Sequence, residues 1–203
     1  LALPPAITAA TGMDPLTHNV ESYLSPAYHP LCDGIALEGA RIAARALAKA
    51  VAEPGNLQAR SDMMMASMMG AIAFQKDLGA VHSCAHALST VADLHHGLAN
   101  GVMIDHVMGF NLPTAVAKMA ELARVCGAPG GAAGSEEARA ASFIVWLREL
   151  KASIGIPAKL AGIAGGRPIT RADLPRLVEV AYADLCHQTN PRKCAKSDFE
   201  ALF

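Results

Sequence analysis

Four of the eight histidines lie within residues 81–100, in a segment whose other residues are mostly apolar. If residues 81–91 form a helix, His82 and His86 are one turn apart and project from the same face. Two imidazoles on one turn of an apolar helix are costly to bury unless each has a polar partner. The rest of the chain is therefore expected to form a frame that brings polar groups to this face.

The composition predicts that this frame is helical. Aromatic residues make up 4% of the 203 residues, whereas a β-sandwich or barrel would contain more of them, together with more Val, Ile and Thr. The chain is long enough for one domain with a substantial core. Apolar spacing, caps and breaks predict an all-α multi-helix bundle, with helices over residues 13–24, 30–51, 57–76, 81–91, 102–110, 115–126, 136–154 and 170–186 and a last one from about Ser197.

Local sequence predicts three further details. Pro15 is expected in the first turn of helix 13–24, because its missing amide would have no partner there. The five methionines between residues 63 and 69 are expected to pack in the core, although an adaptable binding surface is the alternative. The Gly-rich segment 127–134 is expected to be a surface loop, and since no strand precedes it, we do not expect it to bind phosphate.

Charge and cysteine content exclude several classes of protein. The 17 Lys and Arg residues are scattered among 18 Asp and Glu residues, so nucleic acid and anionic membranes are poor candidates as partners. No apolar run reaches the roughly 18–20 residues of a membrane span. Five cysteines without a C-x-x-C spacing predict reduced thiols in a cytoplasmic protein. Because the chain begins Leu-Ala-Leu-Pro-Pro and not with Met, we expect it to be a piece of a longer protein.

A second polar pair lies upstream, where Asp14 and His18 are also separated by one helical turn. His95 and His96 follow the apolar run, and the break at Gly97 would let an imidazole fold back toward the histidine face. A carboxylate and imidazoles from these segments would bind one divalent cation and leave a coordination position open for a substrate oxygen. With no thiolate among them, ferrous iron, zinc, nickel and manganese are all suitable. The alternative is that the histidines fill a polar core and Asp14 interacts with a helix dipole.

Three separated motifs occur in order along the chain. They are the run AATGMDPLTHNVESY at residues 9–23, the pair His82-x-x-x-His86, and the sequence HGLAN at residues 96–100. Together they resemble the C-terminal helical domain of the iron-containing (group III) alcohol dehydrogenases over nearly the whole chain. The spacing of fourteen residues from His82 to His96 agrees with that family. The sequence departs from the family's usual pattern at residues 77–79, at Ser89 and at His95.

The resemblance implies an activity and a set of site residues. The reaction would be the reversible oxidation of an alcohol to an aldehyde or ketone, with hydride transfer to NAD or NADP. The metal would be Fe²⁺, with Zn²⁺ or Ni²⁺ as alternatives. His86 would be a catalytic and cofactor-binding residue beside the nicotinamide and the substrate, and His95 leaves open which of two adjacent imidazoles binds the metal. The implied metal ligands are Asp14, His18, His82 and His96.

The resemblance also implies a domain organisation. Residues 1–203 would form a metal-binding and catalytic α domain like that of dehydroquinate synthase, while the family's N-terminal α/β nucleotide-binding domain would lie upstream of Leu1. We therefore expect the chain alone to bind metal but to turn over an alcohol or aldehyde poorly, and the family suggests a homo-oligomer. Residues 190–192 resemble a late loop of the family. Two alternatives remain: a domain related to glycerol dehydrogenase or dehydroquinate synthase, and a non-catalytic helical module.

Overall fold

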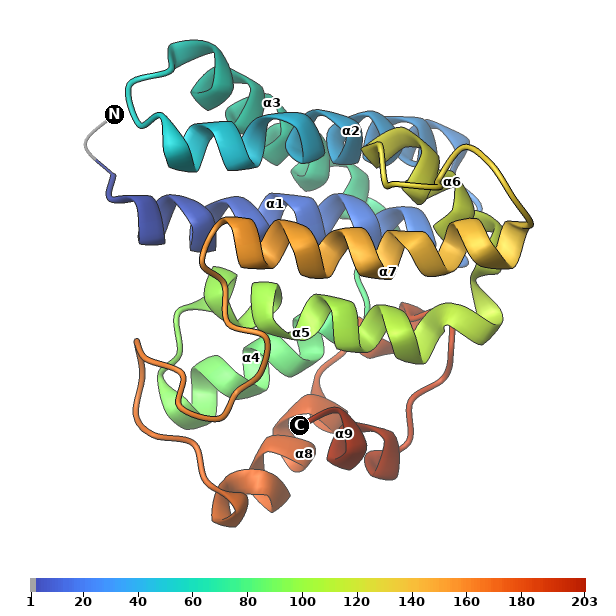
Figure 1. The fold of residues 1–203 in the computed structure, drawn as a ribbon. Coiled ribbons are helices and arrows are strands. Elements are labelled where there is room, and N and C mark those ends of the chain that lie inside the picture. The colour runs from blue at the N-terminus through green and yellow to red at the C-terminus, as the bar shows by residue number, and fades with distance from the viewer. Residues whose placement is uncertain (1–2) are drawn as a thin grey trace.

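The central element of the fold is helix α1 (Pro5–Leu24), which lies between two groups of helices (Figure 1). The computed structural model describes residues 3–203, so the predicted domain 1–203 is described except for its first two residues. The other helices are α2 (Pro30–Ala52), α3 (Leu57–Ala73), α4 (Ala80–Ala92), α5 (His96–Asn111), α6 (Val116–Cys126), α7 (Glu136–Ser153), α8 (Leu174–Ala183) and α9 (Lys196–Leu202). Short 3₁₀ turns lie at Phe74–Lys76, Leu112–Thr114, Arg171–Asp173 and Cys186–Thr189.

Contacts between helices define the packing around α1. Helices α2 and α3 contact α1 and each other, and α5 contacts α1 as well. Helix α4 packs against α5 and α8, α6 packs against α7, and α8 packs against α9. Across residues 3–203 the structure has nine α-helices and no β-strand, which confirms the predicted all-α fold. Within the same residues, no helix combines the length and the apolarity that crossing a membrane requires.

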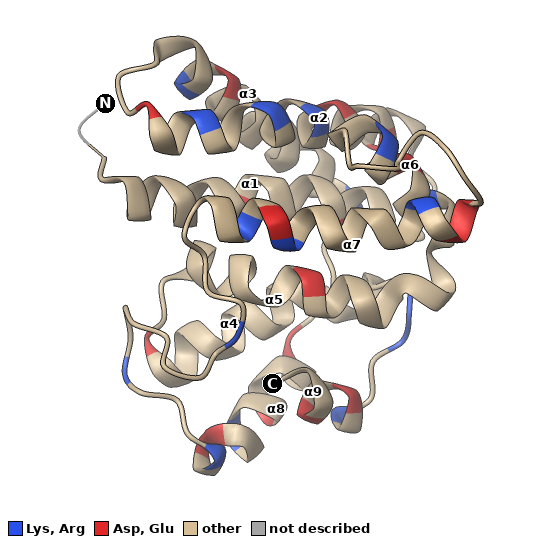
Figure 2. Cartoon of the chain, in the orientation of Figure 1, with Lys and Arg blue, Asp and Glu red and all other residues tan. Residues whose placement is uncertain are grey.

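Small and aliphatic side chains build the core. Ala, Leu and Met dominate the buried residues, and all but one of residues 80–88 on α4 are buried. Charged residues lie mainly along α2, α6 and α7 and in the C-terminal segments (Figure 2). A polar side chain inside this apolar core must therefore find a protein partner or bind a ligand.

Helix α1 begins earlier than predicted, at Pro5 rather than near Met13, and Pro15 lies in its interior rather than in its first turn. The reason is that Pro5 occupies the first turn, where its fixed φ suits the helix and its missing amide costs nothing. Asp14 and His18 therefore project from the middle of a 20-residue helix, not from its end.

Helix α5 also begins earlier than predicted, at His96 rather than near residue 102. The ring of His95 caps the helix by accepting a hydrogen bond from the Leu98 amide at 3.4 Å. Because His96 belongs to the first turn of α5, the helix sets the direction of its side chain. The neighbouring His95 side chain is exposed and used for capping.

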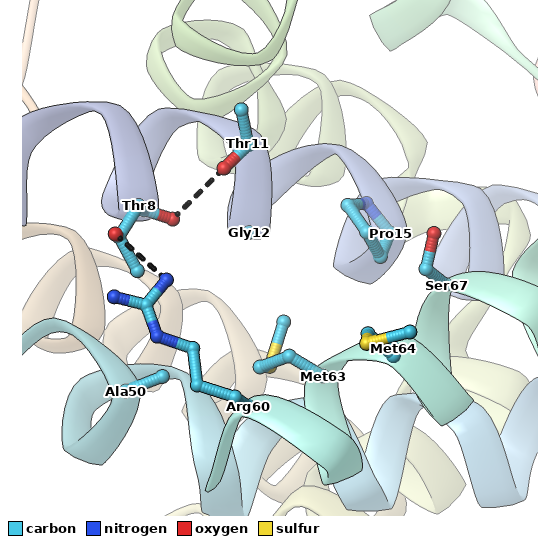
Figure 3. Close-up of a pocket in the computed structure, with 9 residues that line it drawn as sticks. All are labelled: Thr8, Thr11, Gly12, Pro15, Ala50, Arg60, Met63, Met64 and Ser67. Carbon is cyan, nitrogen blue, oxygen red and sulfur yellow. Dashed lines mark hydrogen bonds between the residues drawn. The ribbon is translucent and has the colours of Figure 1, made fainter. Parts of the chain in front are cut away.

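The prediction that the methionine cluster of α3 packs in the core is wrong for Met64, Met65 and Met68, which are 75%, 46% and 52% exposed. One face of α3 packs against α1 and α2, and the opposite face is exposed. The packed face carries small residues, because these let α3 approach the two neighbouring helices closely. Met63 and Met64 instead border a hollow of about 160 Å³ beside α1 (Figure 3). The buried residues of α3 are Ala59, Ala66, Gly70 and Ala73.

A buried ion pair joins α5 to α7. Asp105 and Lys151 are 3% and 2% exposed and form a salt bridge. Lys151 Nζ also donates to Val102 O at 2.8 Å, and Arg148 Nε donates to Asp105 Oδ2 at 2.9 Å. Burial raises the pKa of the Asp105 carboxyl, but the hydrogen bonds from Lys151 and Arg148 outweigh this and lower it below its usual value. Burial lowers the pKa of Lys151, and its hydrogen bond to Asp105 opposes this shift. The contact between the two side chains joins α7 to α5.

Candidate metal centre

Side chains from three helices meet at one point beside the middle of α1. Asp14 and His18 come from α1, His82 from α4 and His96 from α5. Asp14 Oδ1 lies 3.2 Å from His96 Nε2 and 3.6 Å from His82 Nε2. Asp14 Oδ2 lies 3.7 Å from His18 Nδ1. Of the four metal ligands that the resemblance implies, the structure brings Asp14, His18 and His82 together, with ligand atoms within 4.8 Å of one another. It places His96 against Asp14, and of the two adjacent imidazoles it is His96, not His95, that faces this carboxylate.

The pKa values of Asp14, His18 and His82 depend on the contacts among these groups and on their burial. Burial would raise the pKa of the Asp14 carboxyl, but its contacts with His82 and His96 hold the pKa well below its usual value. Burial and the nearby His82 lower the pKa of His18 to about 4. Burial would lower the pKa of His82 as well, yet its hydrogen bonds to Asp14 and Glu21 raise it to about 9. The carboxylates around this point therefore attract positive charge to it.

Glu21 is a member of the cluster that the sequence reasoning missed. It lies seven residues after Asp14 on α1, two helical turns away and on the same face, so the spacing i, i+4, i+7 is the signal that would have found it. Its carboxylate is 2% exposed. Glu21 Oε2 lies 2.6 Å from His82 Nδ1, and Glu21 Oε1 accepts the Val81 amide at 2.7 Å.

The first turn of α4 is held from two sides. Glu21 accepts amide hydrogens of that turn, and Asn190 Oδ1 accepts the Ala80 amide at 3.2 Å. Asn190 and Asn111 also exchange amide hydrogen bonds at 2.7 and 3.0 Å, which ties the predicted late loop 190–192 to the end of α5. Gly79 makes this possible, because a Cβ there would lie 2.6 Å from Glu21 Oε1 and 3.0 Å from Asn190 Oδ1.

His86, the second histidine of α4, lies beside the cluster. Its ring stacks on that of His96 with 5.2 Å between centroids. Its Nδ1 lies 2.8 Å from Asp184 Oδ2, and Asp184 Oδ1 accepts hydrogen bonds from Ser83 Oγ at 2.7 Å and from the Cys186 amide at 2.9 Å. Burial raises the pKa of Asp184, but the hydrogen bonds from His86 and Ser83 outweigh it and hold this pKa well below its usual value. No sequence signal links Asp184 to His86, since they are 98 residues apart.

Helix α5 reaches Asp14 because two residues of the HGLAN sequence fit closely against α1. Asn100 Nδ2 donates to Asp14 Oδ1 at 2.7 Å and fixes the orientation of the carboxylate. Gly97 lies against the backbone of α1, where an added Cβ would lie 2.1 Å from Ala10 O. The glycine therefore sets how close His96 comes to Asp14.

Replacing Gly97 with alanine is expected to destabilise the fold by about 1–3 kcal/mol, because the backbone of α1 or α5 must shift to relieve the overlap. Gly109→Ala is a matched control on the same helix, since a Cβ there meets nothing within 4 Å. The control is expected to leave stability unchanged or raise it by up to about 1 kcal/mol through helix propensity. Urea denaturation measures both variants, and equal stabilities would contradict the close contact.

Comparisons with known proteins agree with this architecture. Residues 8–203 match the sequence profile of the C-terminal part of the Fe-containing alcohol dehydrogenase family. The chain is 39% identical to the 1,3-propanediol dehydrogenase of Klebsiella pneumoniae over 201 residues, which are 98% of this chain and 51% of the relative. It is 36% identical to the 4-hydroxybutyrate dehydrogenase of Cupriavidus necator over 211 residues, 100% of this chain and 52% of the relative.

A crystal structure of 1,3-propanediol oxidoreductase has the same fold. It superposes with a TM-score of 0.94 at 38% identity, over 100% of this chain and 52% of that chain. The chain therefore spans about half the length of the curated relatives that it matches.

Proposed function

This chain belongs to the Fe-containing alcohol dehydrogenase family, and from this premise we propose that residues 1–203 form the metal-binding and catalytic domain of an NAD(P)-dependent alcohol dehydrogenase. The proposed reaction is the reversible oxidation of an alcohol to an aldehyde or ketone. The observation that carries the proposal is that one imidazole from each of α1, α4 and α5 lies within 3.7 Å of an oxygen of the Asp14 carboxylate.

The donor set fits a divalent cation. Bonds of about 2.0–2.2 Å to nitrogen and oxygen ligands place tetrahedral ligand atoms roughly 3.3–3.6 Å apart. The separations of Asp14 oxygens from His96, His82 and His18 nitrogens are 3.2, 3.6 and 3.7 Å. We propose these four residues as the ligands and Fe²⁺ as the metal, with Zn²⁺ or Ni²⁺ accommodated by the same nitrogen and oxygen donors.

The cation, His86 and Asp184 would have different roles in the proposed reaction. When bound, the cation supplies Lewis acidity, which lowers the pKa of an alcohol and polarises a carbonyl. His86 lies next to this point, and its Nδ1–H is held by Asp184, so its Nε2 is free to take a proton from the alcohol and to return it in the reverse direction. Asp184 orients this ring and keeps the same nitrogen available in every cycle.

The substrate and the cofactor are further parts of the proposal. The names of the two relatives described above refer to 1,3-propanediol and 4-hydroxybutyrate, so we propose a short primary alcohol with a second polar group as the substrate. A dinucleotide fold is built on a parallel sheet, and residues 3–203 contain no strand. The nicotinamide cofactor would therefore be bound by another domain, with this chain forming the helical wall of the cleft.

The test is the metal content of the purified chain after anaerobic reconstitution with Fe²⁺ and, separately, with Zn²⁺, measured by plasma mass spectrometry. One ion per chain is expected. The same preparation is expected to show little or no reduction of NAD⁺ with 1,3-propanediol. Absence of metal under both conditions would favour a non-catalytic helical module. Full alcohol-dependent reduction by the chain would show that a separate cofactor-binding domain is not needed.

A further inference from the structure

We propose that Glu21 is a positioning residue for the metal centre, acting through His82. The inference rests on the proposed function, because it concerns how one of the proposed ligands is oriented. Glu21 itself faces the far side of the His82 ring: its Oε2 lies 2.6 Å from Nδ1, while Nε2 of the same ring faces Asp14 Oδ1 at 3.6 Å. The carboxylate therefore acts on the ring and does not bind the ion.

The chemistry of the contact assigns the ring hydrogen. Both Glu21 oxygens accept backbone amide hydrogens, so we assign the hydrogen of the contact to His82 Nδ1, which donates to Glu21. With its hydrogen on Nδ1, a neutral ring presents the Nε2 lone pair to the point where the proposed ligands meet. A carboxylate on the outer nitrogen of a metal-binding histidine also orients the ring and makes it a stronger donor. His82 is 1% exposed, so water does not compete for this nitrogen.

Hydrogen bonds and close packing fix the orientation of the Glu21 carboxylate. Besides the ring, Glu21 accepts the Val81 amide at 2.7 Å and the His82 amide at 3.3 Å, so every group facing its two oxygens is a donor. Gly79 closes the space behind it, since even a Cβ at that position would come within 2.6 Å of Oε1. Glutamine has nearly the same shape, but its NH₂ group would point a donor at another donor in either orientation. Glu21→Gln therefore keeps the volume of the side chain but replaces one of its two acceptor oxygens with a donor.

Asn190 provides a matched control. Its Oδ1 accepts the amide of Ala80, so it supports the same first turn of α4. The contacts of Asn190 are with Ala80, Asn111, Arg192 and Cys194, and none of them is with the His82 ring. Asn190→Ala weakens the support of this helix end without changing what Nδ1 of His82 donates to.

The experiment measures Co²⁺ and Zn²⁺ binding by the 203-residue chain, by competition with a chromophoric chelator, together with thermal unfolding of each metal-free variant. Glu21→Gln is expected to weaken binding by about 10–100-fold and to shift the ligand-field absorption of bound Co²⁺. Asn190→Ala is expected to lower the unfolding temperature while keeping the affinity and the spectrum of the parent. If Glu21→Gln does not fold, Glu21→Asp replaces it, because it keeps the charge but draws the carboxylate back from Nδ1 by one methylene.

The outcomes separate this inference from the proposed function. A parent chain that binds metal and a Glu21→Gln variant that binds equally well would overturn the role of Glu21 alone. Equal losses of affinity in Glu21→Gln and Asn190→Ala at similar unfolding temperatures would reduce Glu21 to a structural support of α4 and would also overturn it. A parent chain that binds neither ion would contradict the metal centre and the inference together.

Discussion

Replacing His96 with alanine is expected to remove the divalent ion from the purified chain, whereas replacing His95 leaves it bound. His96 Nε2 lies 3.2 Å from Asp14 Oδ1, while the His95 ring is exposed and caps α5. The loss of a direct ligand should exceed the about 10–100-fold loss of affinity that changes to outer partners cause. The cost of His95→Ala is limited to a helix cap, about 0.5–2 kcal/mol of stability.

The two histidine variants differ only in which of two adjacent imidazoles is removed, so each serves as the control for the other. Metal per chain is measured by plasma mass spectrometry after identical reconstitution, and far-ultraviolet circular dichroism checks the helical content. Retention of one ion per chain in His96→Ala, or its loss in His95→Ala, would contradict the assignment of the ligand. His82→Ala should behave as His96→Ala does.

Replacing Asp105 with leucine is expected to destabilise the fold by about 3–5 kcal/mol, because it leaves the Lys151 ammonium buried without its carboxylate. For a domain of this size that corresponds to a fall of roughly 6–20 °C in the unfolding temperature. The double variant Asp105→Leu, Lys151→Met is expected to recover most of the loss, since replacing both members of a buried pair by apolar residues is often close to neutral. Calorimetry of the parent, both single variants and the double variant measures this, and additive losses would contradict the pairing.

The same pair predicts an acid dependence of stability. The pKa of Asp105 is lower in the folded chain than its ordinary value, since the hydrogen bonds from Lys151 and Arg148 outweigh the effect of burial. The folded state therefore gains stability from this group above the unfolded pKa of about 3.9 and loses it as the pH falls from there toward the folded pKa. Below about pH 4, the unfolding free energy of the double variant should accordingly fall less steeply with pH than that of the parent.

Local spacing in the sequence was enough to predict the fold class and to nominate the site. The pairs Asp14 with His18 and His82 with His86 are each one helical turn apart, a relation that holds wherever the helix lies in the fold. The predicted starts of α1 and α5 were less accurate, because each depends on a single residue. Pro5 lies in the first turn of α1, and the His95 side chain caps α5. The predicted burial of α3 was wrong for Met64, Met65 and Met68, since the fully buried residues of this helix are small ones.

The partners of the site residues depend on tertiary structure and were not predicted. Asp184 reaches His86 across 98 residues, and Asn190 reaches Ala80 across 110. Nothing local in either segment indicates these contacts, because each forms only when the C-terminal segment returns to α4. Glu21 is the exception, since its place on the Asp14 face of α1 can be derived from helical periodicity alone.

The return of the C-terminal segment to α4 has a practical consequence for engineering the chain. Asp14, His18, His82 and His96 all come from the first half of the sequence, whereas the carboxylate that orients His86 comes from the last twenty residues. A fusion partner or affinity tag attached after Phe203 would therefore adjoin the segment that holds His86 and that also supports, through Asn190, the first turn of α4, which carries His82. In the loop at residues 127–134, which has no helix or strand of its own, residues 132–134 are exposed and are the better place for an inserted tag or reporter.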